Sequence, residues 1–88
     1  MAKKLVKFTV TPSDGLKYWV KVDRRNVDDQ LELDDAEPVH ILVYWMSGNP
    51  GGSLSVVGKD SSKKEVVKMS DTIPAGDTKV AGFVDFSV

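Results

Sequence analysis

The feature that most constrains the fold is a series of short segments in which apolar and polar residues alternate, each ending in a turn rich in Gly, Pro, Asn, Asp or Ser. In the first segment, Val6, Phe8 and Val10 alternate with polar residues. Successive side chains of a β-strand point to opposite faces, so this alternation produces one core face and one solvent face. Such segments recur about every 8–12 residues, a spacing typical of an all-β sandwich or small barrel.

We therefore predict an all-β fold, a small antiparallel β-sandwich of the Ig-like or jelly-roll-like kind, with six to seven short strands joined by hairpin turns. The chain has 88 residues, enough for one core, so residues 1–88 are expected to form a single domain. Residues 73–88 resemble the segment near the last strands of extracellular Ig-like sandwich modules, in which an apolar residue, Pro, a small residue, Gly, an acid and Thr precede an alternating strand. That resemblance supports the fold class.

Two turns carry specific backbone signals. In TPSDG, Pro12 presets the backbone for the second position of a turn and Gly15 accepts the left-handed conformation, which predicts a hairpin between the strands on either side. In SGNPGGS, Pro50 and Gly51 match the central positions of a type II turn, and we predict a second tight hairpin there.

The segment between residues 23 and 38 has weaker signals. Leu31 and Leu33 alternate with acidic residues, which favours a short edge strand within a long acidic loop. A helical turn at residues 27–31 is the alternative, and Pro38 disfavours a longer helix.

The stretch HILVYWM, residues 40–46, is apolar on both faces of a predicted strand. Such a strand is central in its sheet and covered on both sides, or is covered on one side by a partner chain. One face carries His40, Leu42, Tyr44 and Met46, and the other carries Ile41, Val43 and Trp45. The favoured interpretation of Trp45 is a core residue packed between two sheets, and a ligand platform is the alternative.

Candidate binding residues cluster around the aromatic side chains. Trp19 shares its strand face with Lys17 and Lys21, so it belongs to a polar face. An aromatic ring in that setting can stack on a sugar, support a protein contact, or be covered by the lysine stems. Trp19 with its two lysines, and the neighbouring pair Tyr44 and Trp45, are the candidate ligand-binding or interface residues.

The sequence offers little for catalysis or metal binding. There is no Cys, which excludes disulfides, thiolate catalysis and Cys-ligated metal sites. His40 is the only His and is expected to be a strand-end residue with ordinary hydrogen bonds; in an enzyme it would act with an acid from residues 34–37. We predict no enzyme activity, no cofactor and no metal site. Scattered carboxylates that could bind calcium in an irregular loop are Asp28, Asp29, Asp34, Asp35 and Glu37.

Charge is unevenly distributed along the chain. Residues 1–25 are mainly basic and residues 26–58 are acidic without Lys or Arg, while the net charge is only −1. We expect the two segments to lie close together and neutralise each other, and we expect no nucleic-acid partner because no basic field dominates. No apolar run suits a signal peptide or membrane span, so we expect a cytoplasmic protein without a membrane partner; a mature secreted chain would look the same.

These observations favour a non-catalytic β-sandwich binding module that interacts with a protein or glycan partner. Self-association into a homo-oligomer would cover the second apolar face of residues 40–46. One alternative is a carbohydrate-binding, lectin-like module assisted by calcium. Another is a structural subunit of a larger assembly, such as a phage or secretion particle.

Overall fold

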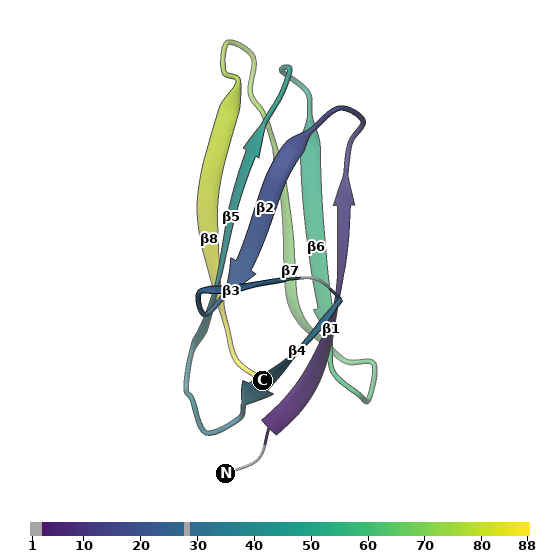
Figure 1. Ribbon diagram of the computed structural model, residues 1–88, viewed down its shortest axis with the longest axis vertical. Helices are drawn as coiled ribbons and strands as arrows, with labels where there is room; N and C mark the ends of the chain where they lie inside the picture. The colour runs from purple at the N-terminus through teal and green to yellow at the C-terminus, as the bar shows by residue number, and fades with distance from the viewer. Residues whose placement is uncertain (1–2, 28) are drawn as a thin grey trace.

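The computed structural model describes residues 3–27 and 29–88 and contains two four-stranded antiparallel sheets that pack face to face (Figure 1). One sheet has the strand order β4-β1-β6-β7, and the other has the order β3-β2-β5-β8. In chain order the strands are β1 (Lys3–Pro12), β2 (Lys17–Val22), β3 (Arg25–Asn26), β4 (Gln30–Asp34), β5 (His40–Ser47), β6 (Ser53–Lys59), β7 (Glu65–Thr72) and β8 (Lys79–Phe86). The molecule is elongated, measuring 46 × 20 × 17 Å.

The predicted β-sandwich is confirmed. The extra strand is the two-residue β3, which is too short to show an alternating pattern. The predicted edge strand is β4, at the end of its sheet. The alternative of a helical turn there is wrong, since residues 27 and 29–31 are not helical. Within the described ranges, no helix is long and apolar enough to cross a lipid bilayer.

The core is built from alternate positions of the strands, as the patterns predict. β5 shows this most clearly, with His40, Leu42, Tyr44 and Met46 all buried. The remaining buried side chains are Val6, Phe8, Val20, Val22, Leu33, Leu54, Val56, Val67, Met69, Ile73 and Phe86. Both sheets contribute side chains to this single core. Removing apolar surface from water stabilises the folded state by roughly 25 cal/mol per Å² of buried area.

The two predicted hairpins are wrong. β1 and β2 belong to different sheets, as do β5 and β6, so each connection crosses the sandwich instead of pairing its strands. The backbone at the two glycines is nevertheless as expected: Gly15 and Gly51 have φ angles of 75° and 90°, and the Gly52 amide donates to the Asn49 carbonyl. The predicted place of Pro12 at the second position of a turn is wrong, because Pro12 ends β1 opposite Leu54 and the turn amide of Leu16 donates to the Ser13 carbonyl. Turn residues fix the backbone locally, but the burial of apolar faces decides whether the flanking strands pair or cross.

Strands β2 and β3 form a hairpin with a two-residue turn, which the sequence patterns do not predict. Its central residues, Asp23 and Arg24, have φ angles of 49° and 70°. A turn of this kind needs positive φ at both positions and normally uses Asn, Asp or Gly, so Asp23 is suited to it and Arg24 is not. Arg24 therefore occupies a conformation that costs a non-glycine residue on the order of 1 kcal/mol.

Substitution of Arg24 with glycine is expected to stabilise the protein. Glycine adopts positive φ without a steric penalty, so we expect the free energy of unfolding to rise by about 0.5–1 kcal/mol. Urea unfolding of Arg24→Gly beside the wild type measures this difference. Arg24→Ala, which keeps the unfavourable φ, serves as the control and should bring no such gain.

The two sheets are also linked on the side where β7 and β8 lie. The Tyr44 hydroxyl donates a hydrogen bond of 2.5 Å to the Asp71 carboxylate, which joins β5 to β7. Tyr44 reaches across Gly82 of β8, where an added Cβ would lie 2.5 Å from the hydroxyl oxygen. Burial, together with the hydrogen bond and charge of Asp71, raises the pKa of Tyr44 to about 12. Glycine at position 82 is therefore required by this close approach.

The basic and acidic segments meet in the sheet that contains β1. The basic strand β1 pairs with the acidic strand β4, with Lys3 opposite Asp34 and Leu5 opposite Glu32. The Arg25 guanidinium of β3 donates to the backbone carbonyl of Glu32. The two segments therefore lie close together, as expected; their mutual neutralisation stays a prediction.

Candidate interaction surface

The outer face of the β3-β2-β5-β8 sheet carries a row of apolar side chains on its two central strands. Strand β5 lies between β2 and β8, as predicted for a strand with two apolar faces. Its residues Ile41 and Val43 are 44% and 36% exposed, and Trp45 is half-buried. Among the described residues, no other element packs over this face as a third layer. The prediction that Trp45 packs in the core is therefore wrong.

Strand register brings the two tryptophans together. Trp19 on β2 lies directly opposite Trp45 on β5, and the next strand places Ala81 opposite Trp45. Trp19 is 41% exposed. Directly opposed residues on neighbouring strands have their side chains in contact range. Two indole rings from separate strands thus form one accessible aromatic surface.

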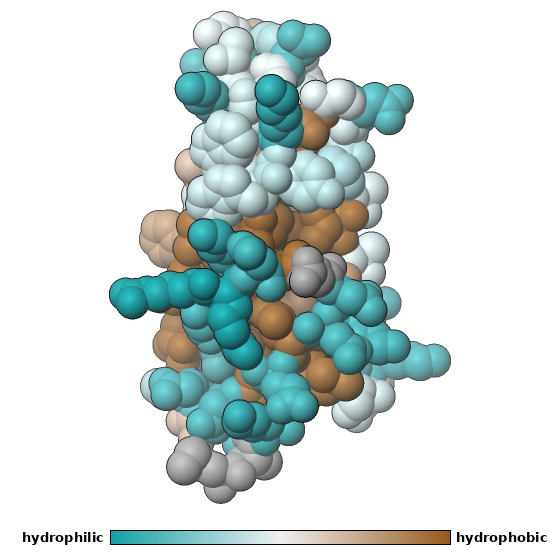
Figure 2. All heavy atoms as spheres, viewed as in Figure 1, coloured by the Kyte–Doolittle hydropathy of each residue, from teal (hydrophilic) through white to brown (hydrophobic). Residues whose placement is uncertain are grey.

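The apolar surface continues toward β8. Val43 of β5 lies opposite Lys21 of β2 and opposite Phe83 of β8, and Phe83 is 69% exposed. In Figure 2 apolar side chains lie along the left side of the molecule, the side on which Figure 1 places β8. We call this surface the outer patch, and its residues are Trp19, Ile41, Val43, Trp45, Ala81 and Phe83.

Lysines border the outer patch at its β2 side. The Lys21 ammonium lies 5.4 Å from the centre of the Trp19 ring, a cation–π arrangement. Lys17 is exposed on the same face and pairs with Ser47. The three residues Lys17, Trp19 and Lys21 therefore share one face, as their alternation indicates.

Tyr44 does not belong to this surface. It is buried and points between the sheets to Asp71, whereas its neighbour Trp45 points outward. Consecutive strand residues face opposite sides, so the predicted pairing of Tyr44 with Trp45 as one stacking platform is wrong. The neighbour of Trp45 on the platform is Trp19.

Two grooves flank the outer patch. One has a volume of about 350 Å³ and is lined by Asp23, Arg24, Ile41 and Val43. The other, about 420 Å³, opens where β2 and β1 diverge at one side of the sandwich; its lining residues are Val10, Tyr18, Trp19, Val20, Asn26 and Val27. The outer patch is therefore bordered by a groove on two of its sides.

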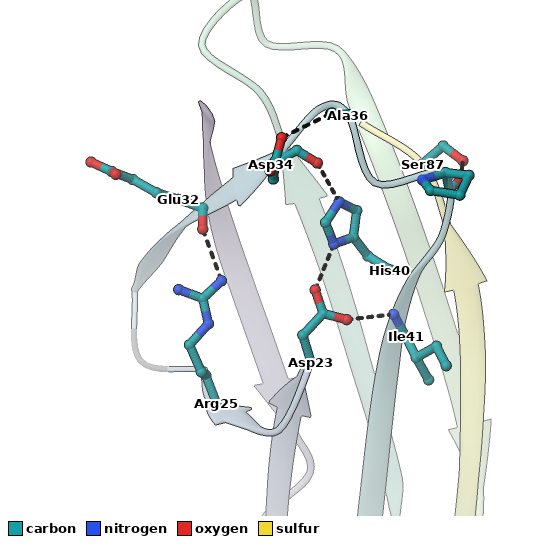
Figure 3. Close-up of polar contacts among 9 residues, drawn as sticks. Asp23, Arg25, Glu32, Asp34, Ala36, His40, Ile41 and Ser87 are labelled. Atoms are coloured by element: carbon teal, nitrogen blue, oxygen red, sulfur yellow. Dashed lines mark hydrogen bonds and ion pairs between the residues drawn. The ribbon is translucent and has the colours of Figure 1, made fainter. Parts of the chain in front are cut away.

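His40 is held rigidly in the core at the start of β5. Only 2% of it is exposed, its Nδ1 lies 2.5 Å from Asp23 Oδ2, and its Nε2 lies 2.9 Å from the Asp34 carbonyl oxygen (Figure 3). A carbonyl only accepts, so Nε2 carries a hydrogen. This agrees with the expected strand-end residue with ordinary hydrogen bonds.

Asp23 is the acid that partners His40. Burial of Asp23 opposes its ionisation, but hydrogen bonds from His40 and the Ile41 amide, with the charges of His40 and Arg25, outweigh burial and lower its pKa. The carboxylate expected from residues 34–37 is absent from this contact, where Asp34 supplies its backbone carbonyl. His40 therefore links the turn between β2 and β3, through Nδ1, to the end of β4, through Nε2.

The acidic residues proposed for calcium are not gathered by the fold. Over residues 3–27 and 29–88, no three His, Asp or Glu side chains lie close enough to share a metal ion. The Asp34 carboxylate accepts from the Ala36 amide within its own turn. Asp29, Asp35 and Glu37 belong to no such group, and Asp28 lies outside the described residues.

Sequence reasoning found Trp19 and its lysines but missed Phe83, the most exposed large apolar residue of the outer patch. The available signal was the alternation within β8: Phe83 shares a face with the charged residues Lys79 and Asp85, whereas Val84 and Phe86 face the core. Comparisons with protein-family models, with curated proteins and with solved structures give no match for this chain.

Proposed function

We propose that this protein is a non-catalytic interaction module whose outer patch binds another protein surface. The observation that carries the proposal is the continuous apolar face formed by two opposed tryptophans, Val43 and Phe83 on one sheet. Aromatic side chains in a contiguous exposed apolar surface are typical of binding interfaces, where burial of a few such residues supplies most of the affinity. Self-association through this face is the simplest case.

The double substitution Trp19→Ala/Trp45→Ala is expected to abolish association. Each ring would lose burial in the interface, and hot-spot aromatic residues typically contribute about 2 kcal/mol or more, so affinity should fall at least tenfold. Sedimentation velocity over a wide concentration range measures the mass of the wild type and the variant. Lys68→Ala/Ser70→Ala, on the exposed face of β7, is the matched control and should sediment like the wild type.

The proposal fails if the wild type associates and the tryptophan variant associates equally well. It also fails if the control variant is as defective as the tryptophan variant. Circular dichroism of each variant establishes that the β-fold is retained.

A second candidate function is carbohydrate binding, favoured by the direct pairing of Trp19 with Trp45. Two accessible rings on adjacent strands offer a flat platform on which a sugar ring can stack. A glycan array probed with the wild type and with Trp19→Ala/Trp45→Ala tests this function, with and without a chelator for the calcium-assisted form. A wild-type array without signal removes the candidate, and so does a signal that the double variant retains.

A further inference from the structure

We propose that two copies of this chain associate along β8, edge to edge and antiparallel, about a twofold axis that passes through Gly82. The two β3-β2-β5-β8 sheets would then form one continuous sheet with four strands from each copy. The inference rests on the proposed function in taking the outer patch as an interaction surface, and it goes further by naming β8 as the contact through which a second copy extends that surface.

The free edge of β8 is the first line of support. β8 is eight residues long and pairs with β5 along its whole length, from Lys79 to Phe86. Among the described strands none pairs with its other edge, and Figure 1 shows β8 as the outermost strand. The unpaired amides and carbonyls of such an edge are a template for another strand.

The sequence of β8 lacks the features that usually protect an edge. Between Lys79 and Asp85 it contains no charge and no proline, and its register with β5 is unbroken. The other terminal strands differ. β3 has two residues, β4 carries Glu32 and Asp34, and β7 carries Lys68 and Asp71. β8 is therefore the edge best suited to strand pairing.

Residue complementarity selects the second copy as the occupant. In an antiparallel pair centred on Gly82, Lys79 lies opposite Asp85 of the second copy, and Ala81 lies opposite Phe83 of the second copy. These residues are exposed on the outer face, so the twofold axis repeats each contact. Each ring meets a small side chain, and an opposite-charge pair closes each end of the contact.

Neighbouring registers lack this match. Opposed residues must face the same side of the sheet, so the centre can move only to another residue. Centring on Ala81 sets Lys79 against Phe83 and Asp77 against Asp85. Centring on Phe83 stacks the two phenylalanines on the axis and leaves Asp85 opposite Ala81. Of these three registers, the one centred on Gly82 places opposite charges across from each other and sets each phenylalanine against a small side chain.

The paired strands would also join the two outer patches. Phe83 of the second copy would lie beside Ala81, whose neighbour on β5 is Trp45. The dimer would therefore present one apolar face built from both chains. This deepens the proposed function, because the partner-binding surface would span two copies.

Charge reversal at the ends of β8 tests the inference. Lys79→Asp and Asp85→Lys each place like charges opposite one another at both ends of the contact. We expect each variant alone to raise the dimer Kd about tenfold or more, because two attractive pairs become repulsive. Both positions are exposed, so the fold should be retained.

Two rescues make the test specific. The swapped variant Lys79→Asp/Asp85→Lys restores opposite charges and should dimerise like the wild type. An equimolar mixture of the two single variants should form heterodimers, because each end then pairs Asp with Lys. Sedimentation velocity at low ionic strength measures all five samples.

The results separate this inference from the proposed function. A wild type that remains monomeric at every concentration, or single variants that dimerise like the wild type, would overturn pairing along β8. If the charge variants have no effect while Trp19→Ala/Trp45→Ala lowers the mass, the outer patch stands and the β8 contact is wrong. If the charge variants raise the dimer Kd and the tryptophan variant does not, the β8 contact stands and self-association through the outer patch is wrong.

Discussion

Replacing His40 with alanine is expected to lower the free energy of unfolding by about 2–4 kcal/mol. The imidazole is buried, so its removal leaves a cavity at the base of β5. It also leaves the Asp34 carbonyl and the Asp23 carboxylate without their ring partners, and Asp23 anchors the hairpin between β2 and β3. Urea unfolding at neutral pH measures the loss. A change within experimental error would contradict a structural role for the ring.

The pH dependence of stability gives an independent view of the same contact. The pKa of Asp23 is lowered from its ordinary value of 3.8, so the unfolded chain takes up this proton at higher pH than the folded protein. The stabilisation is therefore present above pH 3.8 and is lost as the pH falls through the folded-state pKa. We expect Asp23→Asn to be less stable than the wild type at neutral pH, and the difference to shrink below pH 3.8. A difference that stays constant with pH would show that ionisation of Asp23 does not contribute.

Substituting Gly58 with alanine is expected to cost about 1–3 kcal/mol by overpacking the core. Gly58 is buried on β6, where an added Cβ would lie 2.7 Å from Cγ1 of Val67 and 3.0 Å from Cε1 of Phe8. Both neighbours are core side chains from adjacent strands, so neither can move without displacing others. Urea unfolding measures the loss, and a fully stable variant would contradict the close packing described here.

A double-mutant cycle identifies the cause of that loss. Val67→Ala alone removes the methyl groups nearest position 58 and should destabilise the protein by leaving a cavity. In Gly58→Ala/Val67→Ala the new methyl group occupies part of the vacated space. The double variant should therefore be more stable than the sum of the two single losses predicts. Additive losses would indicate that backbone strain at position 58, and not contact with Val67, is responsible.

Alternation of side chains was sufficient to predict which residues share a face. β5 shows this well, because its two sets of residues separate into core and outer face as the sequence indicates. Which set faces the core could not be read from the pattern, because both sets are apolar, and Trp45 was assigned to the wrong side. The covering layer is a property of the whole fold and leaves no local signal.

Strand partners were equally beyond local reasoning. The conformations of Gly15 and Gly51 follow from their turn positions, yet the strands that flank them do not pair. The contact of His40 with Asp23 spans 17 positions and depends on a hairpin in which Arg24, a residue type unusual for positive φ, occupies the second turn position. No short-range sequence pattern predicts such a turn, so the acidic residue that contacts His40 could not be identified from the sequence.

The order of the strands has a consequence for how the chain acquires its structure. Because β1, β4, β6 and β7 alternate along the chain with β2, β3, β5 and β8, neither sheet corresponds to a continuous piece of polypeptide. Only the β2–β3 and β6–β7 connections join neighbours in one sheet, so most pairings must close long loops before they gain any burial. Such topologies fold slowly, on the order of milliseconds to seconds. Synthesis on the ribosome would thus leave β1 without either of its neighbours until β4 has emerged, and β5 without its second neighbour until β8 has emerged.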